Sequence, residues 1–160
     1  MEAARAAATA DLDEIARVAT TAADELRDQR GGPLFLTREH IEAPTEAGFA
    51  ALLTRDDRRL VVGTIDDVIV GYAAGGVERL ADGSNLGVIT DLHVLSGARQ
   101  VGVGEAMVDD LLAWFDGQGC TGIDAFALPG NRAAKNFFET NGFTARLLVM
   151  HRRSTPYSRP

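Results

Sequence analysis

A change of hydrophobic period after Val94 is the feature that most constrains how this chain folds. Three segments before that residue have the pattern of strands separated by short polar turns: 58–65, 68–78 and 86–94. After it, a loop over 96–104 that contains three glycines leads into apolar residues at helical spacing. Three further elements follow: a strand over 121–128, a helix over 131–140 and a closing strand over 143–150. This order predicts an α+β or mixed α/β layer built on one sheet.

The residues before the first of these strands are helical in pattern. From Asp11 to Arg27 the apolar positions recur every three or four residues. Asp11 stands where an N-cap is expected, and Gly31-Gly32-Pro33 provides a stop. Two further helical pieces are expected, one from Thr37 onward and one around Phe49.

The composition is that of one globular domain in a reducing compartment. The chain has 160 residues, 46% of them hydrophobic, and a mean hydropathy of -0.03, so it can bury a core. A single cysteine, Cys120, excludes an internal disulfide framework and a cysteine-rich zinc site. The sequence has no apolar run of membrane-spanning length and no signal-peptide pattern at its start. We therefore expect a cytoplasmic protein that binds no membrane.

The charge is acidic and unevenly distributed. A formal net charge of -7 argues against a nucleic-acid-binding surface. Residues 1–90 carry nine basic and sixteen acidic side chains, whereas residues 91–160 carry seven of each. The second half therefore repels an anionic ligand less, and the first half favours a cationic partner.

The loop over 96–104 has the composition of a phosphate site. Gly102 and Gly104 allow the backbone to approach a ligand closely, and Arg99 adds a positive charge. The start of the following helix has unpaired backbone N–H groups, so a pyrophosphate is the ligand that this loop would bind. Turn glycines beside a surface arginine would give the same pattern. A dinucleotide-binding fold fits less well, because its third small residue falls on Met107.

A second motif follows at 131–143, N-R-A-A-K-N-F-F-E-T-N-G-F, a short helix that Asn131 can cap. Together with R-Q-V-G-V-G at 99–104, this motif resembles the GNAT acetyltransferase superfamily. The earlier segment looks like the family's R/Q-x-x-G-x-G/A pyrophosphate loop, and the later one like its N-x-x-A-x-x-F-Y-x-x-x-G-F helix. Residues 89–94 are similar to the family's fourth strand, and residues 8–12 resemble its first strand running into its first helix.

The resemblance implies a fold, a cofactor and a reaction. The fold would be a mixed, mostly antiparallel central sheet flanked by helices, in a single domain over 1–153 with a C-terminal tail over 154–160. The enzyme would move an acetyl group from acetyl-CoA directly to a primary amine of a small molecule, without a metal. Members of the superfamily often pair through their C-terminal strands, which would make a homodimer. The residues implied in cofactor binding are Leu92, His93 and Val94 at the thioester, Arg99, Gln100, Val101, Gly102, Val103 and Gly104 at the pyrophosphate, Asn131 at the pantetheine arm, and Phe138 near the sulfur.

Two positions depart from the family pattern. The tyrosine that serves as the usual general acid falls on Phe138, which has no proton to give. Thr90 stands where a catalytic glutamate often lies. Asp91 and His93 are the candidate catalytic residues instead, although strand alternation turns Asp91 to the opposite face from Thr90 unless a bulge re-aims it.

The base, the activity and the acceptor stay open at this point. His40 or Glu39, both in the 33–44 segment, or a water molecule could serve as the base instead. The two departures also fit a CoA-binding module without catalysis. An enzyme that acetylates protein lysines or N-termini is a further alternative.

Overall fold

Five strands form one sheet in the order β1-β2-β3-β4-β5, so each strand lies beside its neighbour in sequence. The computed structural model describes residues 1–40 and 44–154. The strands are β1 (Glu2–Ala6), β2 (Arg58–Ile65), β3 (Val68–Arg79), β4 (Asn85–Val94) and β5 (Cys120–Ala125). The pairs from β1 to β4 are antiparallel, and β4 pairs with β5 in parallel. The predicted mixed, mostly antiparallel sheet is therefore confirmed.

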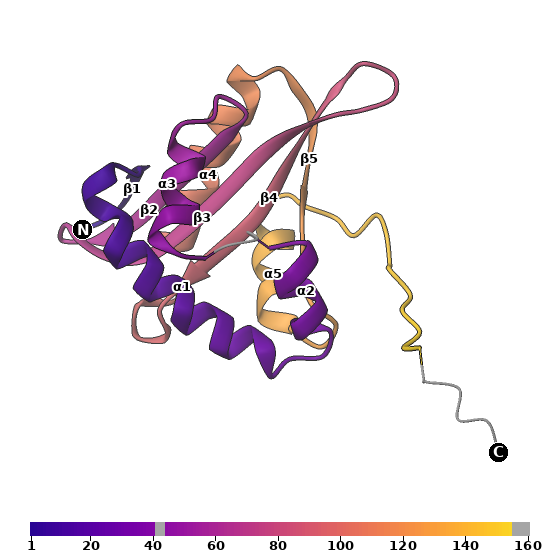
Figure 1. The fold of residues 1–160 in the computed structure, drawn as a ribbon, viewed down its shortest axis with the longest axis horizontal. Helices are drawn as coiled ribbons and strands as arrows, with labels where there is room; N and C mark the ends of the chain where they lie inside the picture. The colour runs from indigo at the N-terminus through magenta and orange to yellow at the C-terminus, as the bar shows by residue number, and fades with distance from the viewer. Residues whose placement is uncertain (41–43, 155–160) are drawn as a thin grey trace.

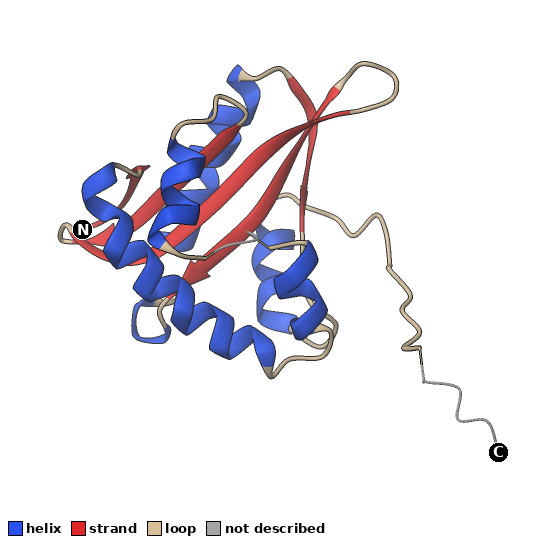
Figure 2. Cartoon of the chain, viewed as in Figure 1, coloured by secondary structure: helices blue, strands red, loops and turns tan. Residues whose placement is uncertain are grey.

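Helices cover both faces of this sheet (Figure 1). They are α1 (Leu12–Arg27), α2 (Gly32–Arg38), α3 (Glu46–Leu53), α4 (Val103–Gly117) and α5 (Arg132–Thr140), with short 3-10 turns at η1 (Thr9–Asp11) and η2 (Ser96–Ala98). α1 and α3 pack on one face, while α4 crosses the other face and contacts all five strands. Figure 2 shows the resulting helix–sheet–helix layers.

Each layer of the fold has its own core. On the α1 side the fully buried side chains include Ile15, Phe49 and Tyr72, with the two aromatic rings 5.4 Å apart. On the α4 side Met107 and Phe115 pack against the sheet. The buried residues of α1 and of α4 recur at helical spacing, which is why each of these helices buries one stripe.

β4 carries one extra residue, Thr90. Ala74 of β3 pairs with Asp91. Gly75, the next residue of β3, pairs with Ile89. Thr90 is left over as a β-bulge, and its hydroxyl donates to the backbone oxygen of Ala74 at 3.3 Å. Because a bulge shifts the alternation of side chains by one, Ile89 packs in the α4 layer while Asp91 faces the α1 layer.

β4 and β5 pair over only part of their length. Their register runs from Asn85 opposite Cys120 to Ile89 opposite Ala125. β4 then continues to Val94, whereas the chain after β5 turns away toward α5 (Figure 1). Beyond Ile89, β4 therefore has no partner strand on the side of β5, and this edge of β4 is open where the two strands diverge.

The predicted helix start at Thr37 is wrong. α2 begins at Gly32 and ends at Arg38, with Pro33 in its first turn. Proline is favoured there because the missing N–H would have no partner in the helix and the fixed φ suits a helix start. Gly31, at φ 78°, turns the chain between α1 and α2. The Gly-Gly-Pro sequence thus separates two helices instead of only ending one.

The first strand lies earlier than predicted. β1 covers Glu2–Ala6, and residues 8–12 hold η1 and the start of α1. Asp11 does precede α1, but its carboxylate makes no side-chain cap on that helix. It accepts from the backbone N–H of Ala8 at 2.8 Å and from two nitrogens of Arg5 at 2.7 and 2.9 Å. These contacts lower the pKa of Asp11, the bond from Arg5 most of all.

The predicted closing strand over 143–150 is also wrong. Among the described residues this segment pairs with no strand, and after Phe143 it leaves the body of the molecule (Figure 1). Arg146 forms an ion pair with Asp124 of β5, but Leu148 and Met150 are 82% and 88% exposed. A strand needs a partner for its backbone groups, and a continuous apolar run does not specify which face is buried.

Two other predictions, the absence of a membrane-spanning helix and the C-terminal tail, can be compared with the described residues only. Within residues 1–40 and 44–154, no helix is both long and apolar enough to cross a bilayer. The tail predicted over 154–160 lies outside the described residues except for Ser154.

Candidate functional site

A cavity of about 1240 Å³ lies where β4 and β5 diverge. Its walls are the end of β4 with the loop after it, the start of α4, the segment from β5 into α5, and the last turn of α1. This volume exceeds the roughly 300–1,000 Å³ that is typical of small-molecule pockets.

Within the part of the chain that the structure describes, no group of three His, Cys, Asp or Glu side chains could hold a metal ion.

The loop between β4 and α4 turns through two left-handed residues. Gln100 has a φ of 65° and Gly102 a φ of 96°. Turns of this kind point successive backbone N–H groups toward one side, where they form an anion-binding concavity. α4 then begins at Val103, and no described side chain caps it. The helix dipole and the N–H groups of its first turn therefore favour an anion at this end.

Gly104 has a packing role in addition. A Cβ at this position would lie 3.1 Å from the ring of Phe137 on α5. The glycine therefore lets the first turn of α4 and the middle of α5 come together. The spacing of the glycines in the sequence does not predict this contact between Gly104 and Phe137.

A buried polar cluster surrounds Asp91 on the α1 side of β4. Oδ2 of Asp91 accepts from the hydroxyl of Tyr72 at 3.1 Å and lies 3.3 Å from Nε2 of His40. All three residues are buried. Burial, followed by the negative charge of Asp91, raises the pKa of Tyr72 well above 10. The bulge at Thr90 is what turns Asp91 into this cluster.

His93 lies two residues further along the same face and lines the cavity. Its Nε2 is buried and has no hydrogen-bond partner among the described residues. Burial lowers the pKa of His93 from 6.5 to about 4, with further effects from Glu25, Arg99 and His40. The ring is therefore neutral at pH 7 and keeps an unused polar atom at the cavity.

Residues 19–143 match the sequence model of the Acetyltransferase (GNAT) family. The chain belongs to the GNAT acetyltransferase family. Its enzymes take the acetyl group from acetyl-CoA, and this GNAT protein is accordingly an acetyl-CoA-dependent acetyltransferase. A search of the curated proteins gives no match for the chain.

Solved structures share this GNAT fold at low sequence identity. An aminoglycoside N-acetyltransferase in complex with CoA is 18% identical, with a TM-score of 0.76 over 96% of this chain and 95% of its own. An acetyltransferase of Trypanosoma brucei is 21% identical, with a TM-score of 0.67 over 96% and 100% of the two chains. An aminoglycoside acetyltransferase from an uncultured soil metagenomic sample is 16% identical, with a TM-score of 0.73 over 97% and 99%.

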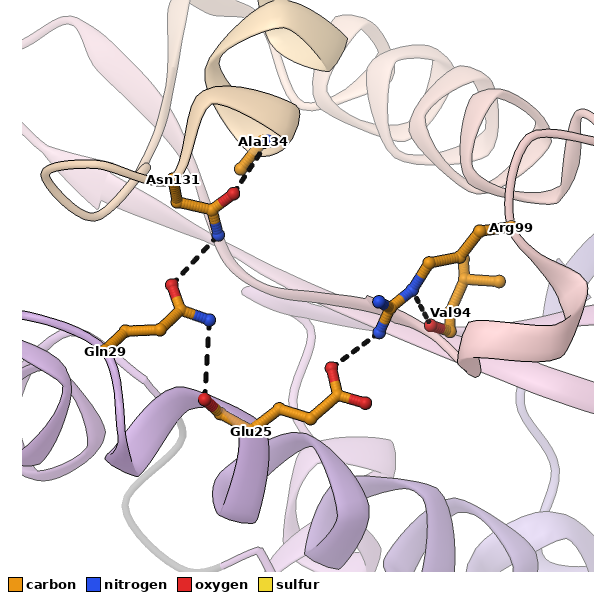
Figure 3. A network of polar contacts seen from close by, with 6 residues as sticks. All are labelled: Glu25, Gln29, Val94, Arg99, Asn131 and Ala134. Carbon is orange, nitrogen blue, oxygen red and sulfur yellow. Dashed lines mark hydrogen bonds and ion pairs between the residues drawn. The ribbon is translucent and has the colours of Figure 1, made fainter.

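The two GNAT motifs face each other across the cavity. Arg99 follows β4, and its Nε donates to the backbone oxygen of Val94 at 2.7 Å (Figure 3). Asn131 caps α5 by accepting from the N–H of Ala134 at 3.0 Å. Arg99 also pairs with Glu25 in the last turn of α1, and the side-chain amide of Asn131 donates to Gln29, which lies just beyond that turn.

Phe138 lies on the cavity side of α5. Its ring packs edge-on against Phe137 and Phe143, at centroid distances of 5.4 and 5.3 Å. The side chain is half-buried, so it contacts both neighbouring aromatic rings and the cavity.

Most of the predicted site residues meet in this one cavity. Those that line it are Asp91, Leu92, His93, Val94, Arg99, Gln100, Gly104, Asn131 and Phe138. Val101, Gly102 and Val103 do not line it: Val101 is half exposed, and Val103 is buried in the α4 core. The role predicted for these three, through their backbone N–H groups, stays a prediction.

Sequence reasoning missed three groups at the site. Tyr72 is a strand residue whose hydroxyl meets Asp91 only because β3 and β4 pair in this register. Glu25 and Gln29 lie in and just beyond the last turn of α1, and both line the cavity. A polar residue at a helix end has the same pattern whether it faces solvent or a site, so no signal in the sequence could have found them. His40, an open alternative, does reach Asp91, whereas Glu39 pairs with Arg38.

Proposed function

We propose that this GNAT enzyme transfers an acetyl group from acetyl-CoA to the primary amine of a small molecule, with residues 1–153 as the catalytic domain. One observation carries the proposal. A single cavity brings together the glycine-containing loop, the open edge of β4 and the N-terminus of α5 with Asn131. A long ligand with an anionic end and an amide-rich arm fits such a cavity, and CoA is a ligand of this kind.

The proposed cofactor pose follows from the chemistry of the walls. The N–H groups around Gly102 and the start of α4 would hold the pyrophosphate. The backbone of Leu92, His93 and Val94 has no partner strand on the β5 side, since the ladder to β5 ends at Ile89. Those groups can therefore pair with the amides of the pantetheine arm and polarise the thioester carbonyl. Asn131 would contact the arm from the opposite wall.

The transfer itself needs a neutral amine and a proton for the leaving thiolate. The amine nitrogen attacks the carbonyl carbon, the C–S bond breaks, and the thiolate takes up a proton. We assign His93 to accept a proton or hydrogen bond from the amine, because its Nε2 is unused and its ring is neutral. Asp91 would hold the ring of His40 beside it, with Tyr72 as the second contact of the carboxylate.

A cationic acceptor is favoured by charge. Residues 1–90, which supply α1 and α2, carry seven more acidic than basic side chains. Two of the structural neighbours are aminoglycoside acetyltransferases, and aminoglycosides carry several ammonium groups. We therefore propose that the acceptor of this enzyme also bears positive charge.

A homodimer is part of the proposal. The extended segment that follows Phe143 exposes Leu147, Leu148, Val149 and Met150. β5 lies at the edge of the sheet beside the start of that segment. A second copy of the chain can cover both surfaces, since apolar runs next to an open strand edge favour association.

A panel of primary amines, with release of free thiol from acetyl-CoA as the readout, tests the activity. Turnover on a small amine supports the proposal. CoA binding by calorimetry without turnover on any amine would point to the non-catalytic module. Turnover only on a lysine peptide or a peptide N-terminus would favour a protein acetyltransferase.

The cofactor site can be tested separately with the Gln100→Glu variant. The substitution keeps the size of the side chain but places a negative charge at the loop that would hold the pyrophosphate. We expect it to weaken CoA binding about tenfold or more, since like charges at a binding site commonly cost over 1.4 kcal/mol. Gln118→Glu, at the opposite end of α4, is the matched control. Equal CoA affinity in both variants would contradict the assignment of the loop.

A further inference from the structure

The end of α1 is hydrogen-bonded to both GNAT motifs (Figure 3). Oε2 of Glu25 accepts from Arg99 at 2.6 Å. Oε1 of Gln29 accepts from the side-chain amide of Asn131 at 3.0 Å, and Gln29 also donates to the backbone oxygen of Glu25 at 3.4 Å. Glu25 and Gln29, at the end of α1, are therefore hydrogen-bonded to Arg99 and Asn131, the two side chains that would contact the cofactor.

The Glu25–Arg99 ion pair is exposed enough to exchange partners. The two side chains are 37% and 44% exposed, and exposed ion pairs are weak because water solvates both charges. Nε of Arg99 stays bonded to Val94, so only the outer nitrogen has to change partner. A pyrophosphate carries a charge on each phosphoryl group and accepts the forked N–H groups of arginine well. Bound at the loop, it would compete for Arg99 against a single carboxylate.

We propose that the pyrophosphate of acetyl-CoA takes Arg99 from Glu25, and that the released Glu25 carboxylate binds the ammonium group of the acceptor. The inference rests on the proposed function, since it requires that the loop holds CoA. Glu25 lines the same cavity as His93. A carboxylate freed from its arginine is a partner for a primary ammonium group through charge-assisted hydrogen bonds. Cofactor binding would thus complete the acceptor site, and the amine would bind second.

The charges around His93 are consistent with this exchange. The charged and titratable side chains that act on the ring are Glu25 of α1, Arg99 of the loop and His40 after α2. In the strand register Tyr72 of β3 lies opposite His93, and Asp91 lies two residues before it on β4. Without ligand, Glu25 raises the pKa of His93 while Arg99 lowers it. When a phosphate neutralises Arg99, the effect of Glu25 remains. The pKa of His93 should therefore rise on CoA binding and make the ring a better proton acceptor.

The first test is CoA affinity, measured by calorimetry on the full chain. Glu25→Gln removes the competitor for Arg99, so it should bind CoA about fivefold tighter than the wild-type protein, the lower end of typical couplings. Glu14→Gln, which removes the same charge from the first turn of α1, should bind CoA as the wild type does. Equal or weaker CoA binding by Glu25→Gln would overturn the exchange.

The second test uses spermidine as the cationic probe, titrated with and without saturating CoA. In the wild-type protein, CoA should tighten spermidine binding about fivefold or more, and spermidine must tighten CoA binding by the same factor. In Glu25→Gln, spermidine should bind weakly whether or not CoA is present. Coupling that survives in this variant, or a wild-type CoA complex that does not bind spermidine, would overturn the role of Glu25.

The two hypotheses fail in different ways. If the wild-type protein does not bind CoA at all, the proposed function fails and this inference fails with it. If the wild type binds CoA and acetylates amines while Glu25→Gln behaves like Glu14→Gln, only the inference is overturned.

Discussion

Thr90 shows how one residue can set the chemistry of a site. Thr90 forms a β-bulge in the β3–β4 pairing. Because of this bulge, Asp91 and His93 face α1, and Leu92 and Val94 lie on the α4 side. The site then depends on single polar atoms, above all Nε2 of His93, which has no partner in the described part of the chain. Side chains of this kind are expected to respond to pH and to conservative substitution.

The first prediction concerns His93 and acid stability. The folded protein holds the pKa of His93 at about 4, against 6.5 when the chain is unfolded. Between these values the unfolded chain binds more protons, so the free energy of unfolding falls as the pH falls from 6.5 to 4. This one residue should remove about 3 kcal/mol of stability across that window.

Denaturant unfolding at pH 7 and pH 4 checks this prediction. His93→Gln should lose less stability between the two pH values than the wild type does. His151→Gln, at an exposed position, should follow the wild type. An identical pH response in all three proteins would show that the buried ring is not the cause.

The second prediction concerns Phe138. A positioned general acid typically contributes about 10²–10⁴-fold, so a family member without the tyrosine should turn over slowly. Phe138→Tyr places a hydroxyl on the cavity side of α5 and should raise kcat about tenfold or more. CoA affinity should stay nearly unchanged, because the ring keeps its contacts with Phe137 and Phe143.

Melting temperature, measured on the same variant, separates this outcome from the alternative. If the new hydroxyl is buried without a partner, the variant loses about 1–3 kcal/mol of stability and gains no rate. Phe143→Tyr, which alters the packing partner instead, is the control and should not raise kcat. A gain in both variants would mean that the hydroxyl does not act at the thioester.

At the scale of elements, α4 depends on glycines in the strands it crosses. A Cβ at Gly75 of β3 would lie 2.7 Å from the ring of Phe115, and one at Gly87 of β4 would also lie 2.7 Å from it. The sheet is therefore shaped to receive one aromatic ring. This contact fixes where α4 lies on the sheet, and with it where the N-terminus of α4 meets the loop after β4.

The third prediction follows from that contact. Gly75→Ala forces the added methyl group against Phe115 and should lower the free energy of unfolding by about 1–3 kcal/mol. Gly117→Ala, in the last turn of α4, meets nothing within 4 Å and should instead stabilise the helix by up to about 1 kcal/mol. Thermal or denaturant unfolding of the two variants checks both signs. A neutral Gly75→Ala would show that the Phe115 ring moves freely.

Elements with a periodic pattern of their own were predictable. The hairpin of β2 and β3 is one case, with Asp66 and Asp67 at φ 47° and 67° in the two-residue turn between them. α1 and α4 are the other cases, because their apolar stripes recur at helical spacing. The two motifs of the site were predictable for a different reason, since their residues resemble a known family.

The errors arose where local pattern does not decide the structure. Pro33 ends one helix or begins the next with equal ease, so α2 was placed too late. The segment over 143–150 has strand-forming residues but pairs with no strand in the described part of the chain. The contacts of Glu25 with Arg99, and of Tyr72 with Asp91, join residues 74 and 19 positions apart. Such contacts depend on how the layers pack, which a single sequence does not encode locally.

At the scale of the whole molecule, the segment after Phe143 pairs with no strand among the described residues, although Arg146 on it forms an ion pair with Asp124 of β5. It extends away from the sheet in Figure 1, although four consecutive apolar side chains on it are exposed. Monomeric proteins rarely expose contiguous apolar surface of this kind. This is the basis of the proposed homodimer.

The fourth prediction is the oligomeric state. Light scattering should find a dimer for the wild-type chain. Leu148→Asp should give a monomer with an unchanged melting temperature at low protein concentration, since Leu148 is 82% exposed in the single chain. Val68→Asp, at another exposed apolar position, should remain dimeric. A wild-type monomer at every concentration would contradict the proposal.

The pairing of β1 with β2 determines the order in which this protein can assemble. Glu2 lies opposite Ile65 and Ala6 opposite Val61, so β1 is synthesised before its partner strand, and the nearest paired residue follows Ala6 by 55 positions. The β2–β3 and β3–β4 hairpins, by contrast, close over short turns and can form as soon as they are complete. Loop closure over a long segment is slower than over a short one, so β1 should join a sheet that already exists. In the native state the amides of β1 should also exchange with solvent before those of the inner strands β2, β3 and β4, because β1 holds one edge of the sheet.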